Sequence, residues 1–360
     1  MCLRRTWLLR ELAGHLDPVR ADIGAVLALG DAELVQAVGG RRGPELRQRL
    51  DELDPSRLRA QARAVGLELV CRCDPAYPTR VRELESPPAV LHVAGGMARF
   101  LAAAGSDPVA LVGCRSASAY GTDVARSLAR SLVCAGVPVI SGMAMGIDAA
   151  AHHGALQAGD RAQAPGGPTI AVLPGSAHRA YPRGAHGLYR ELLRTGSAVS
   201  ELPPGVGIRS WMFLARNRII AALAAMTVVV EAGSRSGALV TATCASALGR
   251  ELGAVPGRIT APQAAGTNRL LKDGARVVCG AQEILDLLFE AGSRTAAADD
   301  RPALDEELLS LLAAIEQGHD TAAALLRQGI LPEQGLAALA SLELAGYVRR
   351  GAGGRLTVVP

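Results

Sequence analysis

The chain has 360 residues, of which 49% are hydrophobic and 20% are charged, so it can bury a large core and is not globally disordered. Its length favours two or three domains. The formal net charge of +4 permits an anionic partner but does not require one. Aromatic residues make up only 3% of the chain, so any stacking of bases would depend on very few side chains.

The seven cysteines are odd in number and scattered along the chain. Cys71 and Cys73 are too close for an ordinary disulfide, and there is no second C-x-x-C-type pair to complete a zinc site. We therefore expect reduced thiols, no metal and no cofactor. The longest apolar run, residues 219–230, is too short to cross a bilayer, and charged residues interrupt the apolar run behind Arg4 and Arg5. This pattern predicts a cytoplasmic protein with no signal peptide and no membrane association.

Residues from about 7 to 70 have the apolar spacing of helices, with glycine-bearing turns at Gly30 and at residues 39–43. This rhythm predicts a small helical domain. It suits a module that contacts a DNA backbone, and it suits better a helical cap or a protein-contact module. Four prolines within residues 73–88 indicate a linker into a new domain, and residues 89–93 follow as a first edge strand.

From Pro108 onward, apolar strands alternate with helices. The strands have no polar alternation, so both of their faces are buried, and the intervening helices require parallel pairing with right-handed crossovers. The pattern predicts an α/β fold with a doubly wound, Rossmann-like parallel sheet. The predicted strands are residues 109–113, 137–141, 169–173, 198–202, 227–230, 251–255 and 276–278.

A second linker is predicted at Asp299, Asp300 and Pro302. Three helices at 304–315, 321–327 and 332–344, followed by two strands at 346–350 and 355–359, form the winged-helix pattern. The third helix has no basic residue, and the basic side chains of the hairpin are Arg349, Arg350 and Arg355. DNA binding and protein contact therefore both remain open for this region.

Glycine occurs after each of the first six strands of the predicted sheet, mostly together with Ser, Thr or Arg. The carboxyl ends of parallel strands meet at one edge of a sheet, where ligands of open α/β folds bind. Bare backbone N–H groups, hydroxyls and guanidinium groups suit phosphate oxygens. This edge is therefore predicted to bind a phosphate-bearing ligand. The loops are residues 113–118, 141–148, 174–176, 201–205, 231–237 and 256–257.

Two nucleotide-binding motifs are missing. Arg115 replaces the second glycine of a dinucleotide fingerprint, and there is no G-x-x-x-x-G-K-[ST] loop for ATP. Asp148 and His152 could share a helix face as a metal pair, but the favoured explanation is a helix-start aspartate and a histidine that holds a loop in place. Glu231 could be a general acid or base, or it could hold a neighbouring loop. No Ser/His/Asp or Cys/His arrangement is indicated.

The remaining ligand is a nucleic-acid strand, which needs several anion sites along one edge and a flat ring for stacking. Charge is available from Arg115, Arg209, Arg216 and Arg218, and a ring from Phe213 or Trp211. No Asp or Glu lies between Glu201 and Glu231, so the field around the helix that opens with Arg216 is positive.

Segments in order over about residues 75–280 resemble the DNA-processing protein A (DprA/Smf) family. They include VALVGCRSAS at 109–118, VISGMAMGIDAAAHHGAL at 139–156, SELPPG at 200–205, FLARNRII at 213–220, VEAGSRSGALVTA at 230–242, AVPG at 254–257 and GTNRLLKDGA at 266–275. The resemblance implies a single-stranded DNA-binding protein without established catalysis. It further implies that the protein protects incoming DNA and helps to load a RecA-type recombinase in natural transformation and recombination.

The resemblance also implies three domains and a homodimer. They are a small helical, SAM/HhH-like domain at 1–72, a Rossmann-like DNA-binding domain at 73–292 and a winged-helix domain at 302–360. The homodimer would form through residues 268–288.

The family's motifs assign roles to residues of this chain. The arginine of G-x-R-x-x-S is Arg115 and the base-stacking ring is Phe213, with Trp211 as a second candidate. Ala215 departs from the family, because many members have arginine there. The expected DNA-binding residues are Arg115, Ser116, Ser118, Gly142, Arg209, Phe213, Arg216, Asn217, Arg218, Ser236 and Gly237.

Two alternatives belong to other functional classes. One is a nucleotide-processing enzyme similar to the LOG phosphoribohydrolases, which share a related Rossmann-like fold. Their P-G-G-x-G-T-x-x-E loop would fall at residues 231–237, where this chain lacks the catalytic glutamate of that loop. The other is a sensor that binds a free nucleotide.

Overall fold

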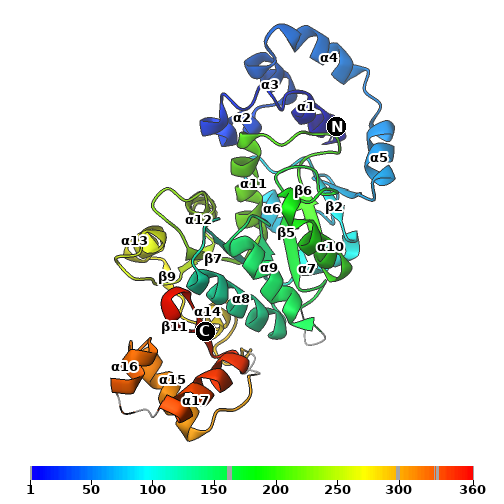
Figure 1. Cartoon of the computed structure of the whole chain (residues 1–360). Coiled ribbons are helices and arrows are strands. Elements are labelled where there is room, and N and C mark those ends of the chain that lie inside the picture. The colour runs from blue at the N-terminus through cyan, green and yellow to red at the C-terminus, as the bar shows by residue number, and fades with distance from the viewer. Residues whose placement is uncertain (1, 160–163, 297–300, 328, 330–331, 360) are drawn as a thin grey trace.

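The computed structural model describes residues 2–159, 164–296, 301–327, 329 and 332–359. Its centre is a nine-stranded sheet with helices on both faces (Figure 1). The strand order is β1-β2-β6-β5-β4-β3-β7-β8-β9. The strands are β1 Glu68–Cys71, β2 Val90–Ala94, β3 Val109–Gly113, β4 Val139–Ser141, β5 Thr169–Val172, β6 Ser197–Ser200, β7 Met226–Glu231, β8 Glu251–Ala254 and β9 Arg276–Val277.

The strands from β6 to β9 in this order all pair in parallel, and β2 pairs antiparallel with both β1 and β6. This arrangement confirms the predicted α/β fold with a mostly parallel sheet. From β3 the chain moves outward through β4, β5 and β6, and it then returns to place β7 on the other side of β3. The sheet therefore has its topological switch point between β3 and β7.

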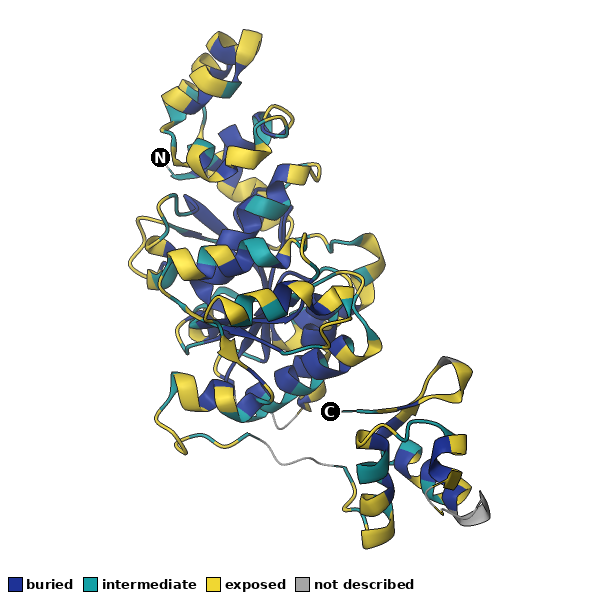
Figure 2. Ribbon diagram, turned by 90° about the vertical axis from the view of Figure 1, so that its left-hand side faces the viewer, coloured by how far each residue is buried: buried dark blue, intermediate teal, exposed yellow. Residues whose placement is uncertain are grey.

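Alternating residues of the strands enter two separate apolar cores. In β3, Val109 and Leu111 pack with helices α8, α9 and α14, whereas Ala110 and Val112 pack with α6, α7, α11 and α12. Figure 2 shows the strands buried between helices whose outer sides are exposed. The helices of the central domain are α6 Thr79–Arg82, α7 Met97–Ala104, α8 Ala119–Cys134, α9 Ile147–Gln157, α10 His186–Thr195, α11 Ser210–Leu223, α12 Ala238–Ala247, α13 Ala265–Lys272 and α14 Ala281–Leu288.

The N-terminal helices share their core with α11. Trp211 is fully buried among them, its indole N–H donates to the Ala13 carbonyl at 2.8 Å, and its backbone N–H donates to Asp17 Oδ1 at 3.2 Å. Met212 and Ala215 belong to the same apolar cluster. These helices are α1 Cys2–Glu11, α2 Ile23–Ala28, α3 Asp31–Val38, α4 Gly43–Asp51 and α5 Pro55–Ala64.

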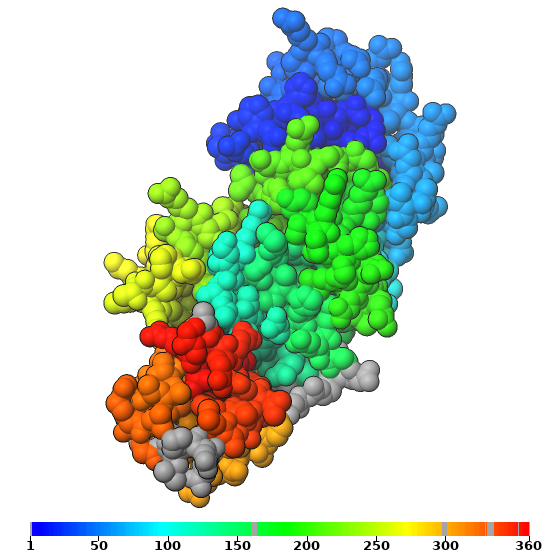
Figure 3. Space-filling model, in the orientation of Figure 1, coloured from blue at the N-terminus to red at the C-terminus, as the bar shows by residue number. Residues whose placement is uncertain are grey.

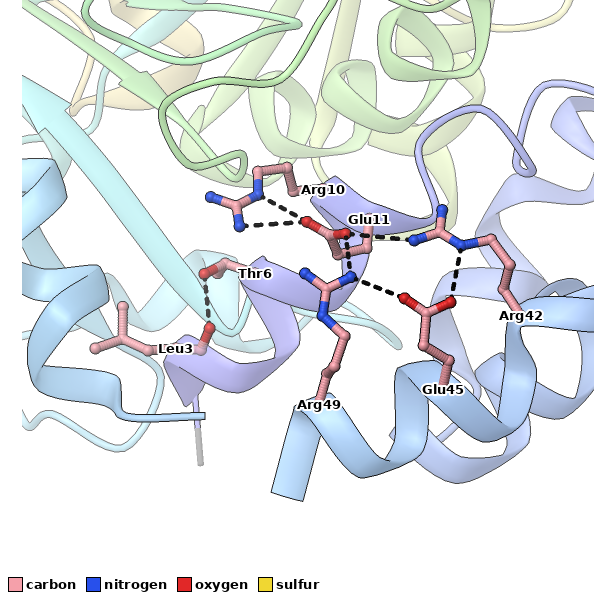
Figure 4. A network of polar contacts seen from close by, with 7 residues as sticks. All are labelled: Leu3, Thr6, Arg10, Glu11, Arg42, Glu45 and Arg49. Carbon is pink, nitrogen blue, oxygen red and sulfur yellow. Dashed lines mark hydrogen bonds and ion pairs between the residues drawn. The ribbon is translucent and has the colours of Figure 1, made fainter. Parts of the chain in front are cut away.

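The N-terminal and C-terminal units lie at opposite ends of the central domain (Figure 3). Near the N-terminus, three arginines surround one carboxylate. Glu11 lies within 3.3 Å of Arg10, 3.8 Å of Arg42 and 3.4 Å of Arg49 (Figure 4). Because ion pairs near the surface contribute little to stability, the apolar cluster around Trp211 holds these helices more firmly than the arginines do.

The C-terminal unit has its own core. Buried apolar residues from three helices and a two-stranded antiparallel sheet form one cluster. Arg349 links this unit to the central domain through an ion pair with Asp123 at 2.7 Å. The elements are α15 Glu306–Glu316, α16 Ala322–Arg327, α17 Pro332–Leu344, β10 Val348–Arg350 and β11 Leu356–Val358.

Four elements differ from the prediction. Residues 68–71 form strand β1 at the edge of the sheet, although helical spacing extends to residue 70, and β2 is consequently an interior strand. Helices α6, α7 and α14 were not predicted, and α6 lies within the expected linker at residues 73–88. The boundary expected at residue 72, between the N-terminal domain and the Rossmann-like domain, falls between β1 and β2. These two strands pair in the same sheet, so this boundary would divide the sheet. The linker residues Asp299 and Asp300 lie outside the described residues.

We propose that residues 302–360 are a winged-helix domain that folds alone, because the core of this unit is separate. The isolated fragment should show helical circular dichroism and a cooperative thermal transition. A fragment of residues 1–72 is the matched contrast. It should stay unfolded, since it lacks Trp211 from its core and β2 as the partner of β1. A non-cooperative 302–360 fragment would contradict the proposal.

Candidate nucleic-acid interface

A groove of about 690 Å³ opens at the switch point, above the carboxyl ends of β3 and β7. Three segments line most of it: the loop after β3, the loop after β7 and one side of α11. The sequence predicts phosphate-type loops at this edge of the sheet. The structure brings three of them together here: the loops after β3 and β7, and the loop after β4, which contributes Ala144 and Asp148. Pro262 and Gln263 close the groove beyond the β7 loop.

An aromatic pair stands beside an arginine at this groove. The Phe213 ring is half-buried, and the Tyr181 ring packs on it with centroids 5.3 Å apart and an interplanar angle of 58°. The guanidinium carbon of the exposed Arg115 lies 5.0 Å from the centre of the Phe213 ring. A flat, partly accessible ring next to a mobile positive charge can stack with a base and contact its phosphate.

The structure separates the two candidate stacking rings. Trp211 is completely buried against the N-terminal helices, so it cannot meet a base. Phe213 lines the groove. Tyr181 was not among the expected site residues. The signal that could have indicated it is its position after the third strand of the predicted sheet.

The loop after β7 supplies a second exposed cation, Arg235. It was not among the expected site residues, although it lies in the Gly- and Ser-rich segment that follows this strand. Ser236 and Gly237 line the groove beside it. The Asn217 side chain donates to the Gly237 carbonyl at 3.3 Å and so ties α11 to this loop.

Arg216 forms the floor of the groove. It is only 7% exposed, and its Nη1 donates to the carbonyls of Gly142 at 2.6 Å and Val172 at 2.7 Å. Burial lowers the pKa of Arg216 to about 10, although the nearby Asp148 acts in the opposite direction. The guanidinium therefore stays charged at neutral pH. A side chain at position 142 would overlap Arg216 Nη1, which explains the glycine there.

The side chains of Asp148 and His152 both make hydrogen-bonding contacts with other groups of the chain. Asp148 accepts from the backbone N–H groups of Gly142 at 3.2 Å and Ala144 at 3.3 Å, and burial raises its pKa. His152 Nδ1 lies 2.8 Å from the hydroxyl of Thr169, which itself donates to a backbone carbonyl. The pKa of His152 is lowered to about 3 by burial, so its ring is neutral. These contacts match the loop-holding alternative rather than a metal pair.

Glu231 ties the loop after β3 to the end of β7. Its carboxylate accepts from the Ser118 N–H at 2.8 Å and the Ser118 hydroxyl at 2.7 Å, and it lies 3.6 Å from the Cys114 thiol. Ser118 also accepts from the Gly121 N–H as the N-cap of α8. Burial, followed by the charge of Glu231, raises the pKa of Cys114 to about 11. These groups hold the loop on which Arg115 is exposed.

Two of the expected DNA-binding arginines point away from the groove. Arg218 is 8% exposed, and its Nη2 donates to both oxygens of Glu201 at 2.8 and 2.7 Å. Its Nη1 donates to the Ser86 carbonyl. Arg209 is exposed just before α11, and its guanidinium lies against Gly14 of the N-terminal region. The expected residues that do line the groove are Arg115, Ser116, Phe213, Arg216, Asn217, Ser236 and Gly237.

The arginines of the C-terminal hairpin are all paired with acids. Arg349 contacts Asp123 at 2.7 Å, Arg350 contacts Glu343 at 2.9 Å and Arg355 lies 3.5 Å from Asp320. These ion pairs all lie within the chain, so DNA binding and protein contact both stay predictions for this hairpin.

Fold and groove together define an α/β protein that presents cations and an aromatic face at the switch point of a Rossmann-like sheet. Residues 68–289 match the family model of the DNA recombination-mediator protein A, and the chain belongs to this family. Within the part of the chain that the structure describes, no helix has the length and apolar character needed to cross a membrane.

Curated relatives agree with this assignment. The chain is 42% identical over 246 residues to the putative DNA processing protein DprA of Mycobacterium tuberculosis. This alignment covers 66% of this chain and 61% of that protein. The chain thus spans less than two thirds of the length of that relative. It is 32% identical over 247 residues to the DNA processing protein DprA of Bacillus subtilis, covering 68% of this chain and 80% of the relative.

Two solved structures are similar. The DNA processing protein A of Streptococcus pneumoniae has a TM-score of 0.63 at 27% identity, over 80% of this chain and 96% of that one. The Helicobacter pylori DNA processing protein A, described for its single-stranded DNA binding mode, has a TM-score of 0.53 at 26% identity. That match covers 62% of this chain and 97% of that one.

Proposed function

We propose that this protein binds single-stranded DNA in the groove between the β3 and β7 loops and acts as a recombination mediator. The observation that carries the proposal is that the Arg115 guanidinium lies over the partly accessible Phe213 ring. Arg235 adds a second exposed cation. The acidic side chain that lines the groove, Asp148, is buried beside Arg216, so the groove remains positive.

We propose binding without catalysis. The catalytic glutamate of the LOG-type loop is missing from residues 231–237. Glu231 itself accepts hydrogen bonds from the Ser118 N–H and hydroxyl groups. Asp148 and His152 are likewise engaged with backbone and hydroxyl groups. The side chains that remain accessible at the groove are cations, hydroxyls and rings, which recognise phosphates and bases.

Arg115→Ala should weaken binding to single-stranded oligonucleotides of any sequence and lower the salt slope by about 0.7, because one phosphate contact is lost. Phe213→Ala should cost about 1–3 kcal/mol of binding free energy through a lost stack. Both effects can be measured by fluorescence anisotropy over a salt series, with double-stranded DNA of the same length compared.

Arg190→Ala is the matched control, because Arg190 is exposed on α10 and the substitution removes the same charge away from the residues that line the groove. Its affinity should equal that of the unaltered protein. Equal affinities for Arg115→Ala and Arg190→Ala would remove the groove as the DNA site. Release of a free base from a nucleoside monophosphate would instead favour the enzyme.

We also propose that the bound strand is passed to a RecA-type recombinase. On DNA coated with single-strand-binding protein, the unaltered protein should shorten the lag before recombinase filaments form. Arg115→Ala should fail to do so, because it no longer holds the strand. The recombinase role would be refuted by a protein that binds DNA with full affinity but leaves the lag unchanged.

We propose that the protein forms a homodimer through residues 268–288, at the end of the sheet formed by β9. Strand β9 is the edge strand; Val277 on it is 56% exposed and Leu287 on α14 is 36% exposed. An accessible edge strand with apolar side chains is a ready partner for a second copy.

Val277→Glu should convert dimers to monomers in light scattering of the purified protein, because it places a charge in the apolar contact. Leu326→Glu is the control, since Leu326 is 48% exposed on α16, outside this region. A monomeric unaltered protein, or a dimer that survives Val277→Glu, would contradict this interface.

A further inference from the structure

Three cysteine thiols converge where the N-terminal helices meet the edge of the sheet. Cys2 begins α1, Cys71 ends β1 and Cys73 lies in the turn that follows. Their sulfur atoms all lie within 4.8 Å of one another. Among the residues that the structure describes, these three form a group of His, Cys, Asp or Glu side chains close enough together to hold one metal ion. The spacing of Cys71 and Cys73 alone does not predict this cluster, because its third member, Cys2, lies 71 positions before Cys73.

The spacing of the sulfur atoms fits a tetrahedral ion. Zinc–sulfur bonds of about 2.3 Å in a tetrahedron place neighbouring sulfurs about 3.8 Å apart. The Cys2 and Cys73 sulfurs are 3.8 Å apart. A disulfide instead needs sulfurs at about 2.0 Å, so forming one would require both side chains to move.

The backbone holds the two sheet-side thiols in place. Cys71 pairs with Val90 in the β1–β2 ladder, and its carbonyl accepts from the Asp74 N–H at 2.8 Å. Between the two cysteines, the Arg72 N–H donates to Ala89 at 2.9 Å. The turn that presents Cys71 and Cys73 is therefore fixed before any ion arrives, which lowers the ordering cost of binding.

Zinc binding exchanges protons for the ion. The three thiols lose their protons when zinc binds, because thiolates are its ligands. Three thiolates with Zn²⁺ carry one net negative charge.

We propose that Cys2, Cys71 and Cys73 bind one Zn²⁺ ion, with water as the fourth ligand, and so fasten α1 to strand β1. Cys73 is exposed and the other two are partly so, which gives the ion a path to the site. Binding releases three protons and involves no change of oxidation state. The role is structural: it joins the first helix of the chain to the outermost strand of the sheet.

The test uses the full chain, purified with a non-thiol reductant and loaded with zinc. We expect one zinc per chain by mass spectrometry of metals after gel filtration. Cobalt in place of zinc should give intense visible bands of a tetrahedral site together with sulfur-to-cobalt charge transfer. The thermal midpoint should rise with added zinc, because the ion binds the folded chain.

Cys73→Ser should lower zinc affinity by at least about 100-fold in a chelator competition and remove the rise in thermal midpoint, since it deletes a ligand. Cys73 is exposed, so this variant keeps the fold, which circular dichroism verifies. Cys279→Ser is the matched control, another exposed cysteine outside the cluster, and should bind zinc normally.

Three outcomes would overturn the proposal: no zinc retained by the reduced protein, equal zinc in Cys73→Ser, or a Cys2–Cys73 disulfide as the only change at the cluster. Arg115→Ala should still bind one zinc, because the site is separate from the groove. Failure of DNA binding and failure of zinc binding are thus independent results.

Discussion

The buried guanidinium of Arg216 is the interaction on which the groove depends. Removing a charge from water is costly unless the charge is hydrogen-bonded and compensated. Here two carbonyls accept hydrogen bonds from Arg216, and the nearby charge of Asp148 favours its charged form. The two carbonyls belong to Gly142, just after β4, and to Val172 at the end of β5. Arg216 therefore clamps two strand ends to α11. Asp148 in turn fixes the loop after β4, and the missing side chain of Gly142 leaves room for the clamp.

Helix α11 serves three neighbours at once, and helical geometry explains how. Successive residues turn by about 100°, so positions two apart point in nearly opposite directions. Trp211 thus enters the N-terminal core while Phe213 faces the groove. Arg216 likewise lies beneath the groove while Arg218 pairs with Glu201. The buried Arg218–Glu201 pair would be costly to break on one side only, by about 3–5 kcal/mol.

This geometry also explains which parts of the site could be predicted. The strand ends were found because buried apolar runs and glycine-bearing loops are local patterns; β3 occupies the predicted residues 109–113. The assignment of Arg216 and Arg218 to one surface ignored their opposite directions. Which of the two faces the ligand depends on where Glu201 lies, and that is a tertiary contact. Tyr181 reaches Phe213 from another segment, so no spacing rule could pair them.

The missed elements have a related cause. Strand β1 follows a helical stretch without a break in apolar spacing, and its identity as a strand is decided by pairing with β2. The convergence of Cys2 with Cys71 and Cys73 depends on the same pairing, because β1 brings the C-x-C turn to the start of α1.

In the groove, the loop backbones are held by hydrogen bonds, whereas the arginine side chains on these loops are exposed. Glu231 holds Ser118 and contacts Cys114, so the loop after β3 is tied on both sides of Arg115. Asn217 ties the loop after β7 close to Arg235. The backbone of the groove is thus ordered without a ligand, and only the exposed arginine side chains would lose freedom when a ligand binds. A site built in this way can bind a strand by its phosphates and one stacked base without reading a sequence, because its rigid parts recognise shape and charge rather than base edges.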